Sequence, residues 1–231
     1  MELSKRLQAV AELVTPGMRL ADVGTDHAYI PIYLVQQKRI PSAVAMDVKQ
    51  GPLERARANI EGYQLGSYID VRLSDGLQAL QPQEADTVVI AGMGGPLVQR
   101  IMTRGEKVLE QMQECILQPQ SEIAQVRAFL AEQGYCITAE NMIEEDGKYY
   151  PMMRVCHGKM HFTGNAETKY GPCLLRDRNP VLLAYLKREQ QVQEKIKQQV
   201  TEHGRQDAEK RLLEIEREMQ DITAALAYYE V

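Results

Sequence analysis

Hydrophobic positions along residues 1–158 alternate between helical spacing and short buried runs. The short runs, which we interpret as five strands, lie at 19–23, 43–46, 69–73, 86–91 and 114–117. Helical spacing precedes or follows them at 3–14, 30–37, 51–60, 96–103 and 121–134. The run at 86–91 is almost continuously apolar, as expected for a central strand buried on both faces. The alternation predicts an α/β fold with a mostly parallel sheet.

Two further apolar runs, 135–142 and 149–155, have only the short turn 144–147 between them. This connection is too short for a crossover helix, so the two strands must pair as an antiparallel hairpin. Five βα units closed by such a hairpin give a seven-stranded sheet, the arrangement of Rossmann-like class I methyltransferases. Dinucleotide dehydrogenases usually lack the hairpin, so its presence favours the methyltransferase arrangement.

The pattern changes after Lys159, where a polar loop at 161–169 leads toward two long helices. Apolar residues of the second helix alternate spacings of four and three, at Ala208, Leu212, Ile215, Met219, Ile222, Leu226 and Tyr229. The first helix carries a looser stripe, at Leu182, Tyr185, Val192, Ile196 and Val200. A short join near 203–204 forces the helices antiparallel, and the stripe becomes the seam of a coiled-coil hairpin.

We therefore expect a Rossmann-like catalytic domain at 1–158, followed by a linker and the C-terminal coiled-coil hairpin at 159–231. No apolar run approaches the roughly 20 residues of a membrane span, and the amphipathic N-terminus does not resemble a signal sequence, so we expect a cytoplasmic protein. The four cysteines are widely scattered without CxxC spacing. We expect core thiols and no metal site.

A formal net charge of −5 argues at first against a nucleic-acid partner. Basic residues nevertheless concentrate between Lys148 and Arg188, where only Glu167 and Asp177 oppose them. Phosphate binding depends on the local field, so this stretch is a candidate RNA surface. An ordinary solvated surface explains the same charges equally well.

The first predicted strand ends in an acid and a tight turn, Asp22-Val23-Gly24, and Asp47 ends the second strand. In βαβ nucleotide folds, an acid about 20 residues beyond the glycine turn binds the ribose hydroxyls. Asp26 and Ala28 replace two of the dinucleotide glycines, and no lysine loop for phosphates is present. A cofactor with ribose but no diphosphate fits better than NAD, which indicates S-adenosylmethionine.

Acids and small residues at successive strand ends are the candidate cofactor ligands. Asp22 would accept a hydrogen bond from the methionine amino end, Asp47 would bind the ribose and Asp75 would bind the adenine amino group. The complete expected set is Asp22, Gly24, Asp47, Val48, Ser74, Asp75, Gly76, Ala91 and Gly92. A single Asp is more often a loop or helix cap, but the ordered set favours the cofactor interpretation.

Asp26, His27 and Tyr29 lie where the sulfonium and the methyl acceptor should meet, so they are the candidate catalytic residues. A lone His is usually structural, and Tyr29 would either stack on a base or pack on the first helix. The fourth strand ends in the glycine-rich segment 91–96, where a large planar group could approach the backbone. A glycine-rich helix start could alternatively bind an anion.

Taken together, these motifs resemble one family, the bacterial tRNA adenine-N1 methyltransferases that modify position 22 (TrmK). The motifs that carry the resemblance are DVGTDHAYIP at 22–31, AMDV at 45–48, SDG at 74–76, AGMGG at 91–95, QPQ at 118–120 and YGPCLL at 170–175. The resemblance runs nearly end to end. It implies methyl transfer from S-adenosylmethionine to N1 of an adenine in the tRNA D-arm, a base that must first leave its helix.

The resemblance also implies roles for the candidate residues. Because N1 is a neutral nitrogen with a lone pair, no strong base is needed, and in-line placement would do most of the work. Asp26 would stabilise the positively charged product ring, and His27 would contact the adenine or its phosphate. Residues expected to contact tRNA are Gly94, Gly95, Lys148, Arg154, Lys169, Arg176 and Arg178.

Several alternatives remain open at this point. The chain could methylate another RNA, a protein or a small molecule, or it could be a non-catalytic cofactor-binding scaffold whose hairpin recruits partners. The apolar stripe of the hairpin closes either within one chain or between two, so a monomer or a weak homodimer is expected.

Overall fold

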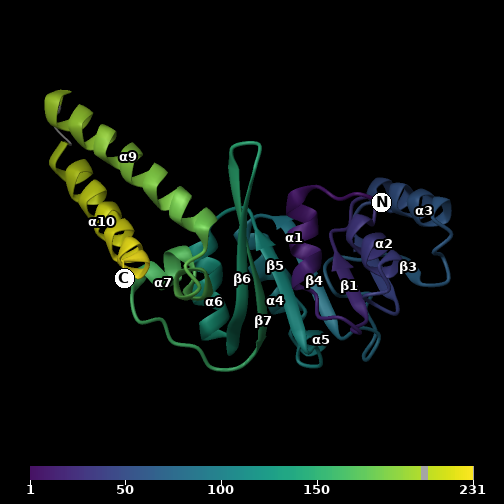
Figure 1. Ribbon diagram of the computed structural model, residues 1–231. Helices are drawn as coiled ribbons and strands as arrows, with labels where there is room; N and C mark the ends of the chain where they lie inside the picture. Colours follow the sequence, from purple (N-terminus) through teal and green to yellow (C-terminus); the bar gives the residue numbers. More distant parts are fainter. Residues whose placement is uncertain (204–207, 231) are drawn as a thin grey trace. The chain divides into compact units, whose positions relative to one another are not determined.

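The computed structural model describes residues 1–203 and 208–230 (Figure 1). The chain divides into two compact units, residues 1–160 and 161–231. This division falls two residues beyond the boundary at 158 that the change in sequence pattern predicts. Each unit is described by itself below.

The first unit contains a seven-stranded sheet in the order β3-β2-β1-β4-β5-β7-β6. The strands are β1 (Leu20–Val23), β2 (Ala43–Asp47), β3 (Ile69–Leu73), β4 (Thr87–Met93), β5 (Glu114–Pro119), β6 (Tyr135–Glu145) and β7 (Lys148–His157). The first five strands are parallel to one another, and β7 runs antiparallel to both β5 and β6. The predicted mostly parallel sheet with a terminal hairpin is confirmed.

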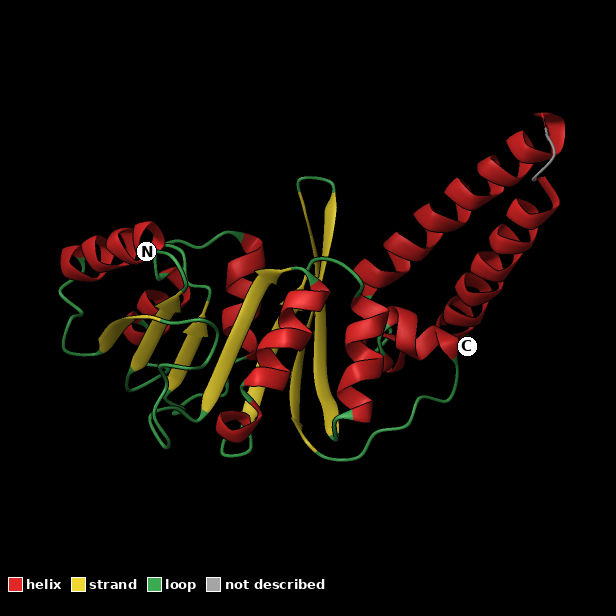
Figure 2. Ribbon diagram, turned by 180° about the vertical axis from the view of Figure 1, so that it is seen from behind, coloured by secondary structure: helices red, strands yellow, loops and turns green. Residues whose placement is uncertain are grey.

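Helices cover both faces of this sheet. They are α1 (Lys5–Leu13), α2 (Tyr29–Gln36), α3 (Gln50–Gly62), α4 (Gly95–Arg104), α5 (Glu106–Leu109) and α6 (Ile123–Glu132). Figure 1 shows α1, α2 and α3 in front of the sheet, and the reverse view in Figure 2 shows α4 and α6 in front. The sequence pattern did not predict α5, because a four-residue helix is too short to display a helical period.

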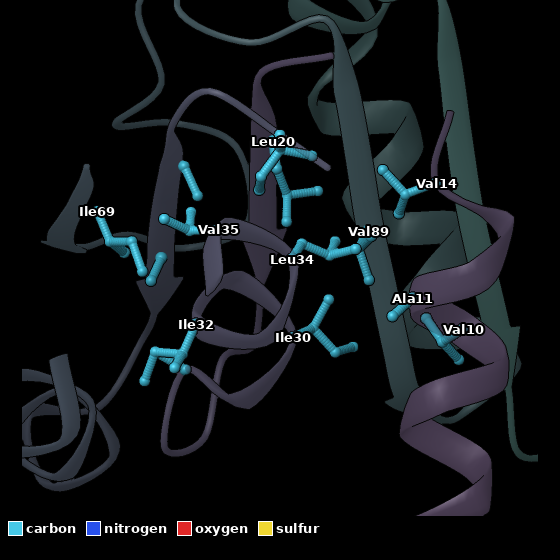
Figure 3. Close-up of a cluster of buried hydrophobic side chains, with 14 of the residues drawn as sticks. Val10, Ala11, Val14, Leu20, Ile30, Ile32, Leu34, Val35, Ile69 and Val89 are labelled. Carbon is cyan, nitrogen blue, oxygen red and sulfur yellow. The ribbon is translucent and has the colours of Figure 1, made fainter. Parts of the chain in front are cut away.

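The face under α1 and α2 holds a cluster of buried aliphatic side chains (Figure 3). Labelled members come from α1 (Val10, Ala11) and the residue after it (Val14), from α2 (Ile30, Ile32, Leu34, Val35) and from strands β1, β3 and β4 (Leu20, Ile69, Val89). Each fully buried Val, Leu or Ile contributes about 1.5–3 kcal/mol. This cluster fixes the start of α2, and therefore the loop that joins β1 to α2.

The strand order reverses between β1 and β4. From β1 the chain proceeds outward through β2 and β3, whereas from β4 it proceeds the other way through β5. Connections that leave these two strands diverge, and ligands of open α/β sheets bind in the crevice that this divergence creates.

The hairpin of β6 and β7 closes through a two-residue turn. Asp146 has φ 53° and Gly147 has φ 73°, the left-handed pair that a tight two-residue hairpin requires. Glu144 Oε1 accepts a hydrogen bond from the Gly147 amide at 2.7 Å. Both strands are longer than predicted, because regular pairing extends to the turn itself.

Helix α6 begins at Ile123, two residues after the start at 121 that helical spacing predicts, and Ser121 does not cap it. The residue that precedes the helix is Glu122, with φ 52° and no side-chain capping bond. Ser121 Oγ instead accepts a hydrogen bond from the Gly95 amide at 3.2 Å, at the start of α4. The hydroxyl satisfies a free amide of a different helix, which local sequence does not reveal.

The second unit is helical throughout its described elements: α7 (Asn165–Tyr170), α8 (Pro172–Arg176), α9 (Pro180–His203), α10 (Ala208–Leu226) and the 3₁₀ turn Ala227–Tyr229. The prediction of a polar loop at 161–169 was wrong in part, because α7 begins within this range. Ala166 and Tyr170 of α7 are buried, as are the apolar residues 173–175 of α8. Burial of these few side chains stabilises helices too short to be recognised by period.

The long helices α9 and α10 pack against each other, and their join at 204 lies outside the described residues. On α10 the predicted stripe is confirmed, with Ile215 and Ile222 buried. On α9, Leu182 and Leu186 are buried, whereas Val192 is 40% exposed. The placement of Val192 in the seam was therefore wrong. The supercoil of a true coiled coil stays a prediction.

No helix among the described residues is long and apolar enough to cross a membrane. The four cysteines are free; Cys115 and Cys173 are buried and the other two are partly buried. In the part of the chain that the structure describes, no group of three or more His, Cys, Asp or Glu side chains is arranged to hold a metal.

Candidate active site

A cleft of about 290 Å³ lies where the strand order reverses. It is lined by the loop after β1, by the end of β4 and by the start of α1. The lining residues are Arg6, Leu7, Asp22, Gly24, Thr25, Asp26, His27, Tyr29, Ile30, Ala91 and Gly92. The structure therefore brings together all three predicted catalytic residues and four of the predicted cofactor ligands.

Asp22 ends in this cleft with its side chain almost fully buried, at 6% exposure. Burial raises the pKa of Asp22 from its ordinary value of 3.8 to about 6, and the nearby Asp47 carboxylate adds to the effect. The Thr25 side chain beside Asp22 opposes part of this rise in pKa. A cationic group bound beside Asp22 would restore the ionised form, which suits a partner that carries an ammonium.

Gly24 makes the tight turn after β1. Its φ of +75° lies in the left-handed region, and a Cβ placed there would lie 2.0 Å from Met93 Cε. The Gly24 and Thr25 amides both donate to the Met46 carbonyl at 2.8 Å. The turn is therefore closed against β2, and the Met93 side chain fills the space that a Cβ at Gly24 would need.

The next residues of the loop adopt a strained conformation. His27 (φ 65°) and Ala28 (φ 54°) are consecutive non-glycine residues in the left-handed region, and Ala28 precedes α2 without a side-chain cap. Such conformations cost of order 1–3 kcal/mol each and persist only where surrounding structure holds them. Here Ala28 is fully buried in the aliphatic cluster.

Polar contacts from α3 hold the same loop. Asp26 Oδ1 accepts hydrogen bonds from Arg55 Nε at 3.0 Å and Nη2 at 2.8 Å. His27 Nε2 lies 3.5 Å from the same carboxylate oxygen. The amide of Asn59 donates to the His27 carbonyl at 3.0 Å.

The ring of Tyr29 stacks on His27, with centroids 4.9 Å apart and planes 7° from parallel. Tyr29 is 37% exposed, so part of its surface is free at the cleft. The two parallel rings form a stacking wall at the cleft, on whose outer face an aromatic base could bind.

The end of β4 supplies the opposite wall. Pairing with β5 shifts register between Ala91 and Met93, which leaves Gly92 as a bulge, with φ +78°. The Gly92 amide donates to Gln118 Oε1 at 3.1 Å, and Arg6 Nη1 donates to the same oxygen at 3.0 Å. Bulges often redirect the chain beside active sites.

Three functional candidates were missed at the sequence level: Arg6, Arg55 and Asn59. Arg6 also lies over the Tyr150 ring, with Cζ 5.8 Å from the centroid. All three are single polar residues on helices, where no local motif distinguishes them from solvated positions. Arg55 and Asn59 are four residues apart on the helix after the second strand, which places them on one helix face. This spacing was the one signal that could have identified them.

The remaining predicted cofactor ligands do not line this cleft. Asp47 Oδ1 accepts a hydrogen bond from the Lys49 amide at 2.8 Å, and Val48 is 60% exposed. Ser74 Oγ donates to the Gly76 carbonyl at 2.9 Å. Asp75 lies 3.2 Å from Arg104 Nη1. Asp75 and Gly76 line a second cavity, of about 80 Å³. Their cofactor roles stay predictions.

The predicted RNA-binding residues of the first unit are dispersed. A Cβ at Gly95 would lie 2.6 Å from the Ser121 carbonyl oxygen, so close packing of α4 explains this glycine. A Cβ at Gly94 would lie 3.3 Å from Ser121 Oγ. Lys148 is exposed beside the hairpin turn. Arg154 contacts Thr15, Thr138 and, at 4.0 Å, Glu114.

The predicted RNA-binding residues of the second unit have partners within it. Lys169 pairs with Glu218 and, at 3.2 Å, with Asp221. Arg176 pairs with Asp177 at 2.7 Å, and Arg178 Nε donates to the Tyr228 carbonyl at 2.8 Å. None of these residues lines the cleft, and their RNA contacts stay predictions.

Comparisons with known proteins agree on one family. The sequence model of the tRNA (adenine(22)-N(1))-methyltransferase family, TrmK, matches residues 20–224. The tRNA (adenine(22)-N(1))-methyltransferase of Bacillus subtilis is 36% identical over 207 residues, which is 87% of each chain.

Solved structures give the same result. A Streptococcus pneumoniae protein in complex with S-adenosyl-L-methionine has 34% identity and a TM-score of 0.86, over 97% of this chain and 100% of that one. M. capricolum TrmK in complex with S-adenosyl-homocysteine has 28% identity and a TM-score of 0.84, over 100% of both chains. The protein belongs to the TrmK family of tRNA (adenine(22)-N(1))-methyltransferases.

Proposed function

We propose that this protein transfers the methyl group of S-adenosylmethionine to N1 of adenine 22 in bacterial tRNA. The observation that carries the proposal is the cleft at the reversal of strand order, which holds Asp22, Gly24, Asp26, His27 and Tyr29 together. Membership of the TrmK family supplies the reaction and the target. The relatives solved with the methyl donor and with its demethylated product support the choice of cofactor.

The residues present fit this cofactor. The buried Asp22 carboxyl suits the ammonium of the methionine portion, and Gly24 lines the cleft beside it without a side chain. Asp47, one strand over, would bind the ribose hydroxyls. Val48 presents an apolar side chain to solvent, which suits the adenine face. Asp75 would bind the adenine amino group. Its contact with Arg104 would then be replaced by a hydrogen bond from adenine.

When bound, the cofactor supplies an electrophilic methyl group on a positively charged sulfur. The adenine N1 lone pair forms the new bond to carbon as the carbon–sulfur bond breaks. The side chains around the cleft therefore need to orient the base and stabilise charge, and not to remove a proton first. Asp26, held by Arg55, would face the positive charge that develops on the ring.

The target base must leave its helix to reach the cleft, which costs a few kcal/mol. The stacked rings of His27 and Tyr29 would offset part of this cost by stacking with the extruded adenine. The D-arm as binding region, the basic contacts from Lys148 to Arg178, a monomeric or weakly dimeric state and a cytoplasmic location all belong to this proposal.

The test is incubation of the protein with an unmodified tRNA transcript and methyl-labelled S-adenosylmethionine, followed by mapping of the labelled nucleotide. Label at N1 of adenine 22, and its absence from a transcript with guanine at that position, is the expected result. Label on a different nucleotide, on protein or on small molecules would refute the assignment.

The scaffold alternative has a separate test. Thermal unfolding with and without S-adenosylhomocysteine measures cofactor binding alone. A rise in melting temperature with no methylation of any RNA would favour a non-catalytic binding protein.

A further inference from the structure

Helix α3 sends two polar side chains, one turn apart, to the strained loop of the cleft. Arg55 holds the Asp26 carboxylate, as described above, and Asn59 contacts His27. A spacing of four residues places both side chains on one face of the helix. Neither Arg55 nor Asn59 lines the cleft, so both act on it through loop residues 26 and 27.

Asn59 contacts His27 at two atoms through its amide nitrogen. Asn59 Nδ2 donates to the His27 carbonyl oxygen at 3.0 Å and lies 3.4 Å from His27 Nδ1. An amide nitrogen carries two hydrogens and accepts none, so His27 Nδ1 must be the acceptor in this contact. The ring proton of neutral His27 then sits on Nε2, which lies 3.5 Å from Asp26 Oδ1.

These contacts fix both the tautomer and the plane of the ring. Asn59 beside Nδ1 and Asp26 beside Nε2 orient the imidazole from opposite edges. The Tyr29 ring covers one face, with the two ring centroids 4.9 Å apart. The bond to the His27 carbonyl also stabilises the left-handed backbone at φ 65°. One side chain outside the cleft thereby determines the shape of the stacking wall.

We infer that Asn59 is a positioning residue for the methyl transfer, which holds His27 in the Nε2–H tautomer and its ring parallel to Tyr29. This inference rests on the proposed function, since the stacking wall matters only if a base binds there. Charged and titratable groups that face His27 are Asp26 and Tyr29 from its own segment and Arg55 from α3, with Asp22 and Arg6 at the same cleft.

The sharpest variant is Asn59→Asp, which keeps the shape and replaces the donor by an acceptor. His27 would then have a carboxylate beside each ring nitrogen, so each nitrogen would have an acceptor for an N–H. Asn59→Leu removes the donor without adding charge and leaves the tautomer unfixed. Gln64→Glu is the matched control, an amide-to-acid change at an exposed position just after α3.

The experiment measures ¹⁵N chemical shifts of His27 in the full-length protein, together with kcat and KM for tRNA and the affinity for S-adenosylhomocysteine. For the unchanged protein we expect a protonated Nε2 and an unprotonated Nδ1. Asn59→Asp should protonate both nitrogens and lower kcat about tenfold or more, with cofactor affinity within about twofold. Asn59→Leu should lower kcat without the doubly protonated signal, and Gln64→Glu should match the unchanged protein.

Two results would overturn the inference: a proton on Nδ1 in the unchanged protein, or an unchanged kcat in both Asn59 variants. Parallel loss of kcat, cofactor affinity and melting temperature would show a purely structural role and would also overturn it. Failure of the unchanged protein to methylate tRNA refutes the proposed function. The NMR result decides the tautomer independently of that outcome.

Discussion

We expect pH to change ligand binding in the cleft through the carboxyl group of Asp22. Its burial raises its pKa to about 6, within the range where binding can be measured. Only the ionised form attracts an ammonium, so protonation of Asp22 competes with a cationic ligand. The effect of pH on binding and its effect on the stability of the empty protein should therefore have opposite signs.

Affinity for S-adenosylhomocysteine should fall as pH decreases. With a pKa of about 6, about a tenth of Asp22 is ionised at pH 5, so affinity should be about tenfold weaker there than at pH 7.5. Isothermal titration calorimetry at both pH values measures the change. Asp22→Asn should bind weakly at both, and an equal pH dependence in that variant would assign the titration to a different group.

Stability of the empty protein should decrease with rising pH across the same range. Because the folded-state pKa lies above the unfolded value of 3.8, the folded state holds its proton more tightly, and stability is lost as pH rises toward 6. Asp22→Asn, which never ionises, should gain about 1 kcal/mol relative to the unchanged protein between pH 5 and pH 7.5. Urea unfolding at both pH values tests this, and no relative gain would contradict it.

At the residue scale, the sequence predicted the part of the cleft that is contiguous in the chain. Asp22, Gly24, Asp26, His27 and Tyr29 gather there because one turn and one helix start place them side by side. Residues that reach the loop from α1 and α3 were not predictable, since they depend on how helices pack and not on local pattern. The stack of Tyr29 on His27 depends on side-chain rotamers, which sequence does not specify.

At the element scale, a buried ion pair attaches α6 to β6. Arg127 Nε and Nη2 each lie 2.9 Å from Glu140 Oε1, and both side chains are at most 1% exposed. Arg127→Met should destabilise the protein by about 3–5 kcal/mol, because it takes the guanidinium away from a buried carboxylate. Chemical denaturation measures the loss.

The double variant Arg127→Met, Glu140→Leu is the control for this prediction. It removes both charges, so it should recover most of the stability that the single variant loses. Equal loss in the single and double variants would show that packing volume, and not the buried charge of Glu140, is responsible.

Contact between the start of α4 and the loop before α6 requires a glycine. A Cβ at Gly95 would lie 2.6 Å from a backbone oxygen and 3.0 Å from Val126 Cγ2, so Gly95→Ala should cost about 1–3 kcal/mol. At Gly62, near the end of α3, nothing lies within 4 Å of the same position. Gly62→Ala should be neutral or stabilising by up to about 1 kcal/mol, and thermal unfolding compares the two. Equal effects would contradict the packing explanation.

Elements long enough to show a period were predicted, and shorter ones were not. The seven strands and the long helices follow from hydrophobic spacing and turn length. Helices α5, α7 and α8, of four to six residues, are held by tertiary burial that no local pattern records. The prediction for Val192 failed for a related reason. An apolar residue on α9 does not by itself show which face of the helix packs against α10.

At the scale of the whole molecule, every candidate cofactor residue belongs to the unit of residues 1–160. A fragment of residues 1–160 should therefore bind S-adenosylhomocysteine with an affinity within about threefold of the full chain. Methylation of tRNA should fall at least about tenfold, because the candidate phosphate contacts from Lys169 to Arg178 are deleted. Near-UV circular dichroism verifies folding of the fragment, and full activity in it would refute the predicted RNA role of residues 161–231.

The cleft exists because β1 and β4 send their connections in opposite directions, a property of strand order and not of any loop. Buried strands carry the stability, while the turns above them carry the chemistry. Selection or design can therefore change the acceptor specificity of this fold by replacing the segment after β4, while the buried core stays unchanged.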